Sequence, residues 1–208
     1  MCYISAIEKH HKGNYRMSYK TYHVQVYKDG TKEWWLNGRR HREDGPAIEQ
    51  SDGSKYWYLN GQRHRTDGPA CEYSGGSKAW YLNGQSHRED GPAVEWTNGT
   101  KEWWLNGQLH RTDGPAVEWP DGTKEWWLNG RRHRKDGPAL ERSDGRKSWW
   151  LNGELHREDG PARERSDGTK EWYINGQKLS ESAFSKHPAT CSGKVIEVDG
   201  KKYRIVEI

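Results

Sequence analysis

The feature that most constrains the fold is a repeat of constant length. An Asn-Gly pair recurs every 23 residues, and its asparagines are Asn37, Asn60, Asn83, Asn106, Asn129, Asn152 and Asn175. A fixed period of this size is typical of a chain built from one supersecondary unit stacked many times. Such a unit cannot bury its apolar side chains alone, so its neighbours must complete the core. We therefore expect a repeat array.

The period divides the chain into three parts. Residues 1–23 lack it and are predicted to form an N-terminal cap, residues 24–176 hold about seven 23-residue units, and residues 177–208 are predicted to form a C-terminal cap. In this last part we expect a short helix within residues 179–186 that begins after Ser180 and covers the last repeat with Phe184. A loop over residues 187–193 and a β-hairpin over residues 195–208 follow.

Composition decides between an ordered array and disorder. Hydrophobic and charged residues each make up 31%, which alone would favour disorder, but 13 Trp and 11 Tyr argue for a thin aromatic core. The net charge of +4, with acids and bases interleaved, is weaker than the basic bias of a dedicated nucleic-acid binder. Cys2, Cys71 and Cys191 lack metal-ligand spacing, and no long apolar run occurs. We expect a cytoplasmic protein with no cofactor and no metal.

Each unit carries two turn signals. Asn-Gly between an aromatic run and a basic stretch predicts a two-residue type I′ turn. That register pairs Leu36 with Arg39, Trp35 with Arg40, Trp34 with His41 and Glu33 with Arg42. Asp-Gly, as in Pro120-Asp121-Gly122, predicts a three-residue loop with a bulge.

Charges support the three-residue loop independently. In every unit a Glu precedes a Lys by six residues, as in Glu49/Lys55, Glu72/Lys78, Glu95/Lys101, Glu118/Lys124, Glu141/Lys147 and Glu164/Lys170. A three-residue loop places these opposite charges face to face. A two-residue loop would instead oppose Glu95 with Glu102, which is unfavourable.

Strand alternation then defines two faces. The first face carries the invariant tryptophans with the Leu, Ala and His positions, and we expect it to be the scaffold core: Trp34, Trp57, Trp80, Trp103, Trp126, Trp149 and Trp172. The second face carries Trp or Tyr beside neighbours that change from Ile48 and Val94 to Arg142, Arg163 and Arg165. This second face predicts either a binding surface or a second core layer.

The candidate binding residues lie mostly on this second face. They are Trp35, Tyr58, Tyr81, Trp96, Trp104, Trp119, Trp127, Trp150 and Tyr173, together with Arg88, Arg111 and Arg134. Trp, Tyr and Arg are the typical anchors of protein interfaces. The arginines belong to a regular row with two interpretations. The row either follows phosphates while aromatic rings stack on bases, or it pairs with acids such as Glu33, Glu102, Glu125 and Glu171.

A His-Arg-x-Asp-Gly-Pro-Ala motif recurs six times and could suggest acid/base chemistry or metal binding. Its histidines are His41, His64, His87, His110, His133 and His156. An enzyme needs one site with its own environment, so six copies favour a structural role. We expect the His to pack beside Trp and the Asp to hold the turn before Gly-Pro. The chain is predicted not to be an enzyme.

Residues 37–42, Asn-Gly-Arg-Arg-His-Arg, and residues 52–61, Asp-Gly-Ser-Lys-Tyr-Trp-Tyr-Leu-Asn-Gly, resemble the MORN repeat. The family's 23-residue unit has an aromatic-x-Asn-Gly-x-x-His-Gly run and an Asp-Gly before Tyr. The likeness covers about residues 24–176, although the family's His-Gly-x-Gly is replaced by His-Arg-x-Asp-Gly-Pro-Ala. Variants of this type resemble uncharacterised repeat proteins of tailed phages and large DNA viruses. The resemblance implies an elongated antiparallel sheet of hairpins that attaches to proteins or membrane surfaces.

The expected fold is all-β, an elongated single-sheet antiparallel meander of tandem hairpins with two strands per unit. The expected function is a non-catalytic scaffold that binds a protein partner through the aromatic and Arg-rich face. The resemblance places it as a phage or viral adaptor or inhibitor of a host defence protein, in the host cytoplasm. The alternative is nucleic acid or another anion bound along the Arg row. We do not expect a membrane surface as partner, and a homo-oligomer stays open.

Overall fold

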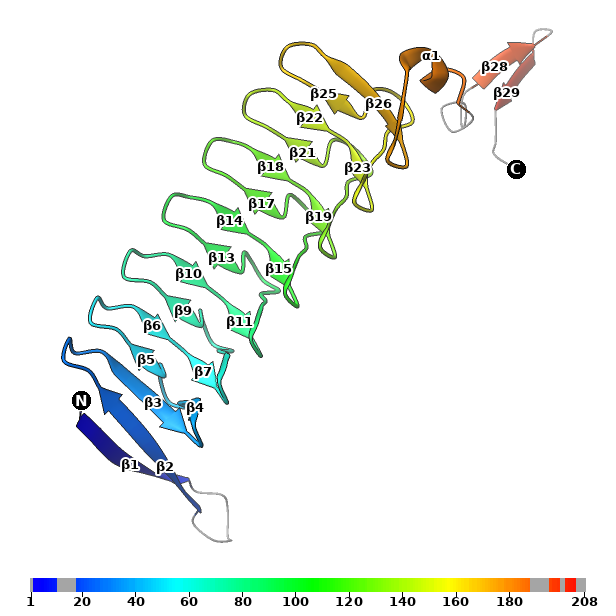
Figure 1. Cartoon of the computed structure of the whole chain (residues 1–208). Coiled ribbons are helices and arrows are strands. Elements are labelled where there is room, and N and C mark those ends of the chain that lie inside the picture. The colour runs from blue at the N-terminus through cyan, green and yellow to red at the C-terminus, as the bar shows by residue number, and fades with distance from the viewer. Residues whose placement is uncertain (1, 11–17, 188–194, 199–200, 205–208) are drawn as a thin grey trace. The chain divides into compact units, whose positions relative to one another are not determined.

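The computed structural model describes residues 2–10, 18–187, 195–198 and 201–204, with side-chain environments for residues 21–187. The chain forms two compact units, Met1–Gln108 and Leu109–Ile208. Tandem antiparallel hairpins with a period of about 23 residues make up both units, and a single short helix lies near the C-terminus of the described chain (Figure 1). The predicted all-β meander is confirmed.

In the first unit, one antiparallel meander runs in the order β1-β2-β3-β5-β6-β9-β10-β13-β14. Its strands are β1 (Cys2–His10), β2 (Ser18–Val26), β3 (Lys32–Leu36), β5 (Ile48–Glu49), β6 (Lys55–Tyr56), β9 (Cys71–Glu72), β10 (Lys78–Ala79), β13 (Val94–Glu95) and β14 (Lys101–Glu102). Because β1 and β2 pair along their whole length and β2 also pairs with β3, this hairpin extends the sheet beyond the first repeat.

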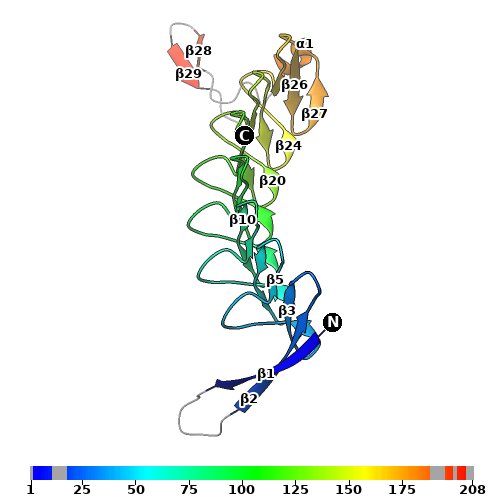
Figure 2. The ribbon, with the colours of Figure 1, turned by 90° about the vertical axis from the view of Figure 1, so that its left-hand side faces the viewer.

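In the second unit, the meander runs in the order β17-β18-β21-β22-β25-β26-β27. Its strands are β17 (Val117–Glu118), β18 (Lys124–Glu125), β21 (Leu140–Glu141), β22 (Lys147–Ser148), β25 (Arg163–Glu164), β26 (Lys170–Ile174) and β27 (Gln177–Leu179). A separate hairpin pairs β28 (Val195–Val198) with β29 (Lys201–Arg204), as predicted. Turned by 90°, the ribbons of each unit are seen nearly edge-on (Figure 2).

A second set of very short hairpins closes around the Asn-Gly pairs. They are built from β4 (Arg39–Arg40), β7 (Tyr58–Leu59), β8 (Gln62–Arg63), β11 (Tyr81–Leu82), β12 (Gln85–Ser86), β15 (Trp104–Leu105), β16 (Gln108–Leu109), β19 (Trp127–Leu128), β20 (Arg131–Arg132), β23 (Trp150–Leu151) and β24 (Glu154–Leu155). In each turn both Asn and Gly have positive φ, for example 51° at Asn37 and 71° at Gly38, which is the type I′ conformation. The predicted pairing of Leu36 with Arg39 and of Trp35 with Arg40 is confirmed.

The Asp-Gly turns close three-residue loops, also as predicted. Trp119 N donates to Thr123 O at 3.0 Å, and Gly122 has a φ of 87° that a bulge of this kind requires. Glu118 therefore lies opposite Lys124. Lys124 in turn lies opposite Glu141 of the following repeat, so opposite charges alternate across the sheet.

The predicted register past Arg40 is wrong at one point. Glu33 lies opposite Ile48 rather than Arg42. His41 N still donates to Trp34 O at 3.0 Å, but Arg42 N donates to Tyr58 O of the next repeat at 3.1 Å. The chain leaves the hairpin there because its backbone donors find acceptors one repeat ahead, and the Gly-Pro that follows cannot continue a strand.

Small residues under aromatic rings make the core. The alanines of the repeated motif are fully buried: Ala47, Ala70, Ala93, Ala116, Ala139 and Ala162. On the second face of the first unit, Cys71, Ala79 and Val94 form a buried cluster. Tyr56, Tyr73, Tyr81 and Trp104 pack against this cluster. The second face therefore contributes to the core as well as the first.

The helix α1 (Glu181–Phe184) begins after Ser180, whose Oγ accepts from Ala183 N at 3.2 Å, as predicted for an N-cap. Phe184 is buried, and α1 packs on β26 and β27. Most of the loop predicted over residues 187–193 lies outside the described residues, as do residues 199–200 and 205–208. Within the described chain, no helix combines the length and apolar character needed to cross a lipid bilayer.

Candidate binding surface

On the first face, the arginine of the repeated motif covers the invariant tryptophan in five repeats. The Arg42 guanidinium carbon lies 4.2 Å from the centroid of the Trp34 ring. Equivalent distances are 4.0 Å for Arg65 over Trp57, 4.1 Å for Arg88 over Trp80, and 3.9 Å for both Arg134 over Trp126 and Arg157 over Trp149. A cation held on an indole face at this distance is an attractive cation–π contact.

Hydrogen bonds hold each of these arginines in place, as Arg88 shows. Its Nε donates to Asp90 Oδ1 at 2.8 Å, and its Nη1 donates to Pro92 O at 3.2 Å and to Glu95 Oε1 at 3.0 Å. A Cβ added to Gly91 would lie 3.1 Å from the Arg88 guanidinium carbon. A side chain at residue 91 would therefore press on the guanidinium, which lies on the Trp80 ring. The hydrogen bond and charge of Arg88 also hold the pKa of Asp90 below its usual value.

The candidate arginines Arg88, Arg111 and Arg134 are thus engaged inside their own loops. Arg111 pairs with Asp113 and Glu118, and Arg134 with Glu141. The ion-pair partners of these arginines are therefore acids of their own repeat. The sequence-based prediction that they pair with acids such as Glu33, Glu102, Glu125 and Glu171 is wrong. The reason is the loop path after Arg40, which turns these side chains back over their own Asp-Gly-Pro segment.

The motif histidines join consecutive repeats. His64 Nδ1 accepts from Asn83 N at 3.2 Å and lies 2.9 Å from Asn83 Oδ1. His41 meets Asn60 in the same way. In five of the six motifs the Asp accepts a hydrogen bond from the Arg, so Asp and His are not arranged there as an acid/base pair. Among the described residues, no group of three His, Cys, Asp or Glu side chains is placed to hold a metal ion.

On the second face, cations lie between aromatic rings of successive repeats. The Arg40 guanidinium carbon is 5.2 Å from the Trp35 centroid and 5.8 Å from that of Tyr58. Arg63 lies 5.2 Å from Tyr81 in the first unit. In the second unit Arg132 lies 5.0 Å from Trp127 and 5.5 Å from Trp150.

Glutamate side chains hold three indoles of this face by hydrogen bonds. Trp104 Nε1 donates to Glu102 Oε2 at 2.9 Å, and Trp96 Nε1 donates to the other oxygen of Glu102 at 2.9 Å. Trp127 Nε1 donates to Glu125 Oε2 at 2.8 Å. The rings of Trp96, Trp104 and Trp127 are therefore held in one orientation.

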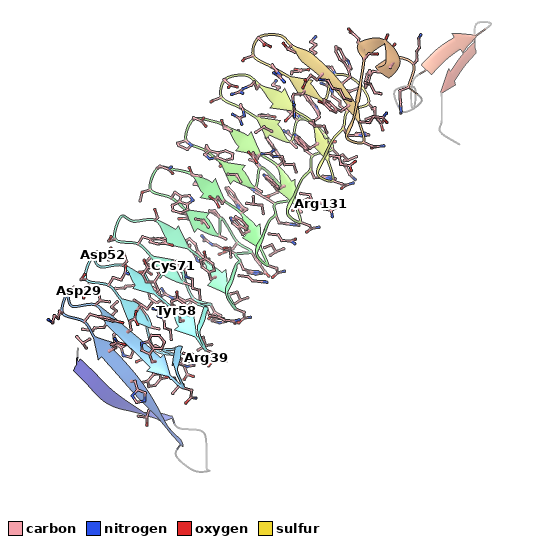
Figure 3. All side chains as sticks on the ribbon, viewed as in Figure 1. Asp29, Arg39, Asp52, Tyr58, Cys71 and Arg131 are labelled. Atoms are coloured by element: carbon pink, nitrogen blue, oxygen red, sulfur yellow. The ribbon has the colours of Figure 1, made fainter. Side chains whose placement is uncertain are left out.

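The structure gathers the candidate aromatic residues on one face of each unit. Trp35, Tyr58, Tyr81, Trp96 and Trp104 lie in the first unit, and Trp119, Trp127, Trp150 and Tyr173 in the second. Most are half-buried, whereas Trp96 is 44% exposed and is the one exposed large hydrophobic side chain of the described residues. Figure 3 labels Tyr58 and the buried Cys71, with Asp29 and Asp52 at the Asp-Gly turns and Arg39 and Arg131 at the Asn-Gly turns.

A basic cavity of about 410 Å³ lies in the second unit around Trp150. Six cations and one acid line it: Arg132, Arg142, Arg146, Lys147, Arg163, Arg165 and Glu164. Sequence reasoning noted Arg142, Arg163 and Arg165 as a change in the second face but did not count them as candidates, and it missed Arg146. The sequence signal that could have identified them is that each is basic at a position where the repeats of the first unit have an uncharged residue.

No known protein-family model matches the chain, and no curated protein matches it in sequence. Function must therefore be inferred from the contacts and charges of the two faces.

Proposed function

We propose that the chain is a non-catalytic repeat scaffold that binds a protein partner through its second face. One contrast carries the proposal. On the first face, the guanidinium of the same repeat lies 3.9–4.2 Å from the tryptophan centroid in five repeats. On the second face, the cations lie 5.0–6.0 Å from the ring centroids, and Trp96 is 44% exposed. Aromatic side chains with arginine beside them are the commonest hot spots of protein interfaces.

The second-face rings suit this role because they are fixed in advance. Glu102 anchors both Trp96 and Trp104 by their indole N–H groups. Side chains already held in one rotamer lose little entropy on binding, and this loss is one of the main costs of forming an interface. The variation along this face, from Tyr73 and Trp96 to Trp119 and Arg142, gives successive repeats different chemistry for a partner to distinguish.

The 23-residue period and the hairpin geometry support the MORN-like interpretation, in which such arrays serve as attachment surfaces. The resemblance to phage and large-virus repeat proteins supports a setting as an adaptor or inhibitor of a host defence protein in the host cytoplasm. The contacts of His64 with Asn83 and of Asp90 with Arg88 support a structural role for the His-Arg-x-Asp-Gly-Pro-Ala motif rather than a catalytic one.

A nucleic-acid track along the Arg row draws little support from the geometry. Arg88, Arg111 and Arg134 already donate to carboxylates and to proline carbonyls, and their side chains are only 21–28% exposed. A phosphate would have to displace an acid and a cation–π contact at every repeat.

The test is capture of a partner by the tagged full chain from a host lysate, with and without nuclease. We expect one stoichiometric protein that survives nuclease. Trp96→Ala combined with Trp119→Ala should weaken its binding by about thirtyfold or more, the cost of losing a hot spot. Gln62→Ala, an exposed change at an Asn-Gly turn, should leave binding unchanged.

Circular dichroism of each variant separates lost binding from lost folding. Recovery that disappears with nuclease would point to nucleic acid instead. Full capture by the folded double tryptophan variant would place the interface elsewhere.

A further inference from the structure

The basic cavity of the second unit is built by departures from the repeat. One period earlier, Arg142 corresponds to Trp119, Arg146 to Thr123, and Arg163 to Leu140. Arg165 in turn repeats the change made at Arg142. These substitutions come from three different strands and turns, yet all of them line one cavity of about 410 Å³.

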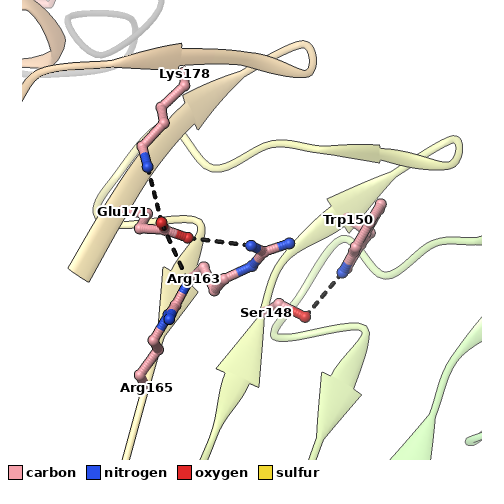
Figure 4. A network of polar contacts seen from close by, with 6 residues as sticks. All are labelled: Ser148, Trp150, Arg163, Arg165, Glu171 and Lys178. Carbon is pink, nitrogen blue, oxygen red and sulfur yellow. Dashed lines mark hydrogen bonds and ion pairs between the residues drawn. The ribbon is translucent and has the colours of Figure 1, made fainter. Parts of the chain in front are cut away.

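One of the departures removes a negative charge. In the preceding repeat, Glu125 accepts from the Trp127 indole and from Arg132 at 3.0 Å. Ser148 takes the place of that glutamate, and its neutral hydroxyl accepts the Trp150 indole N–H at 2.8 Å. The indole N–H keeps an acceptor at the same distance, but the carboxylate that would offset a neighbouring cation is missing (Figure 4).

An acid beside the cavity is shared among several cations. Glu171 pairs with Lys178 at 2.8 Å, with Arg163 at 3.1 Å and with Arg165 at 3.4 Å. The hydrogen bond from Lys178 is the main reason that the pKa of Glu171 lies below its usual value. One carboxylate offsets one of these three positive charges, so a positive excess remains at this side of the cavity.

The other side of the cavity has a similar excess. Arg146 pairs with Asp144, whose pKa is lowered mainly by that hydrogen bond and to a small extent by Arg142. Within the described chain, the exposed Arg142 side chain has no carboxylate of its own at ion-pair distance. Glu164, the one acid in the lining, is already held by Arg157 at 3.2 Å.

We infer that this cavity binds a carboxylate side chain from an acidic peptide segment of the protein partner. The inference rests on the proposed function and assigns it a second contact site. Guanidinium groups bind carboxylates with paired, charge-assisted hydrogen bonds, and Arg142 and Arg165 have donors to spare. The apolar Trp119 and Trp127 of the preceding repeat would contact the residues flanking the acid.

An acidic peptide fits better than a nucleic acid because three of the cations have no basic counterpart one repeat earlier. There, Trp119, Thr123 and Leu140 stand in the places of Arg142, Arg146 and Arg163. A phosphate backbone that continued along the sheet would leave the basic cavity and meet apolar side chains. A peptide in which acidic residues alternate with apolar ones matches both parts of the surface.

The test measures binding of a short fluorescent peptide of alternating Glu and Leu to the full chain. The matched peptide has Gln for every Glu. We expect the Glu peptide to bind about tenfold tighter, and added salt to weaken it by screening. Arg142→Glu with Arg165→Glu should weaken it by at least about tenfold, while Arg131→Glu, which reverses one charge at an exposed turn, should have little effect.

Ser148→Glu is the sharper variant because it restores the residue used in neighbouring repeats and removes no arginine. It should fold normally and still weaken the Glu peptide. Equal binding of the Glu and Gln peptides, or unchanged binding by folded Ser148→Glu and the double arginine variant, would overturn the inference. Tighter binding of a single-stranded oligonucleotide that displaces the peptide would overturn it in favour of nucleic acid.

The capture experiment separates this inference from the proposed function. If Trp96→Ala with Trp119→Ala loses the partner while Ser148→Glu keeps it at full strength, the second face is the interface and the cavity is not part of it. If the tryptophan variant keeps the partner, the proposed function itself fails.

Discussion

The arginine of each His-Arg-x-Asp-Gly-Pro loop combines three interactions in one side chain. Arg88 lies on the Trp80 ring, pairs with Asp90 and Glu95, and donates to the Pro92 carbonyl. None of these would be strong at an exposed surface. Together they fix a long side chain in one position, so a loop with no regular secondary structure becomes a lid on the first face.

Adding a single methyl group to this loop should therefore be costly. In Gly91→Ala the new Cβ meets the Arg88 guanidinium carbon at 3.1 Å, and either the arginine or the loop must move. We expect a loss of about 1–3 kcal/mol in unfolding free energy, typical of overpacking, measured by urea denaturation.

The matched control is Gly75→Ala, whose Cβ meets no atom within 4 Å and whose φ is not positive. It should be neutral or slightly stabilising because alanine restricts the unfolded chain. Equal destabilisation by both changes would mean that the guanidinium is not the obstacle.

The motif aspartates predict how stability depends on pH. Hydrogen bonds from Arg65, Arg88 and Arg111 are the main reason that the pKa values of Asp67, Asp90 and Asp113 lie below 3.8. A lowered folded-state pKa contributes stability that is present above the unfolded value and is lost as pH falls through the folded value. We expect thermal unfolding midpoints to fall as the pH drops from about 4 towards 2.

Asp67→Asn with Asp90→Asn isolates this effect. The variant should be less stable than the native chain near neutral pH, and it should lose less on acidification because two of the titrating groups are gone. Parallel curves for the two proteins would show that these ion pairs do not set the acid response.

At the scale of the element, the Asn-Gly hairpin depends on the repeat before it. Each turn needs positive φ at two successive residues, which Asn and Gly tolerate better than other residues. The histidine of the preceding repeat then accepts the Asn backbone N–H, as His87 does from Asn106 at 3.2 Å. The turn is thus set by local conformation and positioned by a neighbour.

Hydrogen exchange can measure this dependence directly. His87→Ala should speed exchange of the Asn106 amide severalfold because its acceptor is replaced by water. The Asn83 amide, held by His64 at 3.2 Å, should keep its native rate and serves as the internal control. A similar increase in exchange rate at both amides would indicate destabilisation of the whole unit instead of the loss of one hydrogen bond.

The elements predicted correctly were those fixed by short-range chemistry. Asn37-Gly38 and Asp121-Gly122 define their turns within two residues, and the charges of Glu118 and Lys124 select the register. The path after Arg40 could not be predicted, because it depends on the Tyr58 carbonyl of the following repeat. The basic cavity was missed for the same reason, since Arg142 and Arg163 meet only after strands pair.

At the scale of the whole molecule, the repeats of each unit are joined by hydrogen bonds whose partners lie about one period apart in the sequence. Hydrogen bonds between side chains or turns link residues 19, 20 or 22 apart, such as His64 with Asn83, Ser74 with Ser54 and Ser74 with Asp52. Stability in such a chain is close to a sum of repeat terms and neighbour terms.

Removal of one whole period should therefore be tolerated. Deletion of residues 78–100 joins Ser77 to Lys101, which restores the same sequence pattern and lets Glu72 face Lys101 in place of Lys78. We expect a folded protein with an unchanged far-ultraviolet circular dichroism shape and a smaller urea m-value, because less surface is exposed on unfolding.

Deletion of residues 78–89 provides the control. It removes about half a period, so the strands after the deletion can no longer pair in the native register. It should unfold or aggregate. Equal tolerance of both deletions would contradict the idea that the hydrogen bonds between repeats set the register.

Because these hydrogen bonds reach only to the next repeat, they also affect how the chain folds during synthesis. The sequence separation between partners stays short, and proteins with local contacts fold fast. A ribosome would supply each period in roughly 1–5 s at its usual rate, long enough for a finished repeat to close on the one before it. Nascent chains halted at increasing lengths should gain protease resistance in steps of one period, so folding and synthesis would advance together.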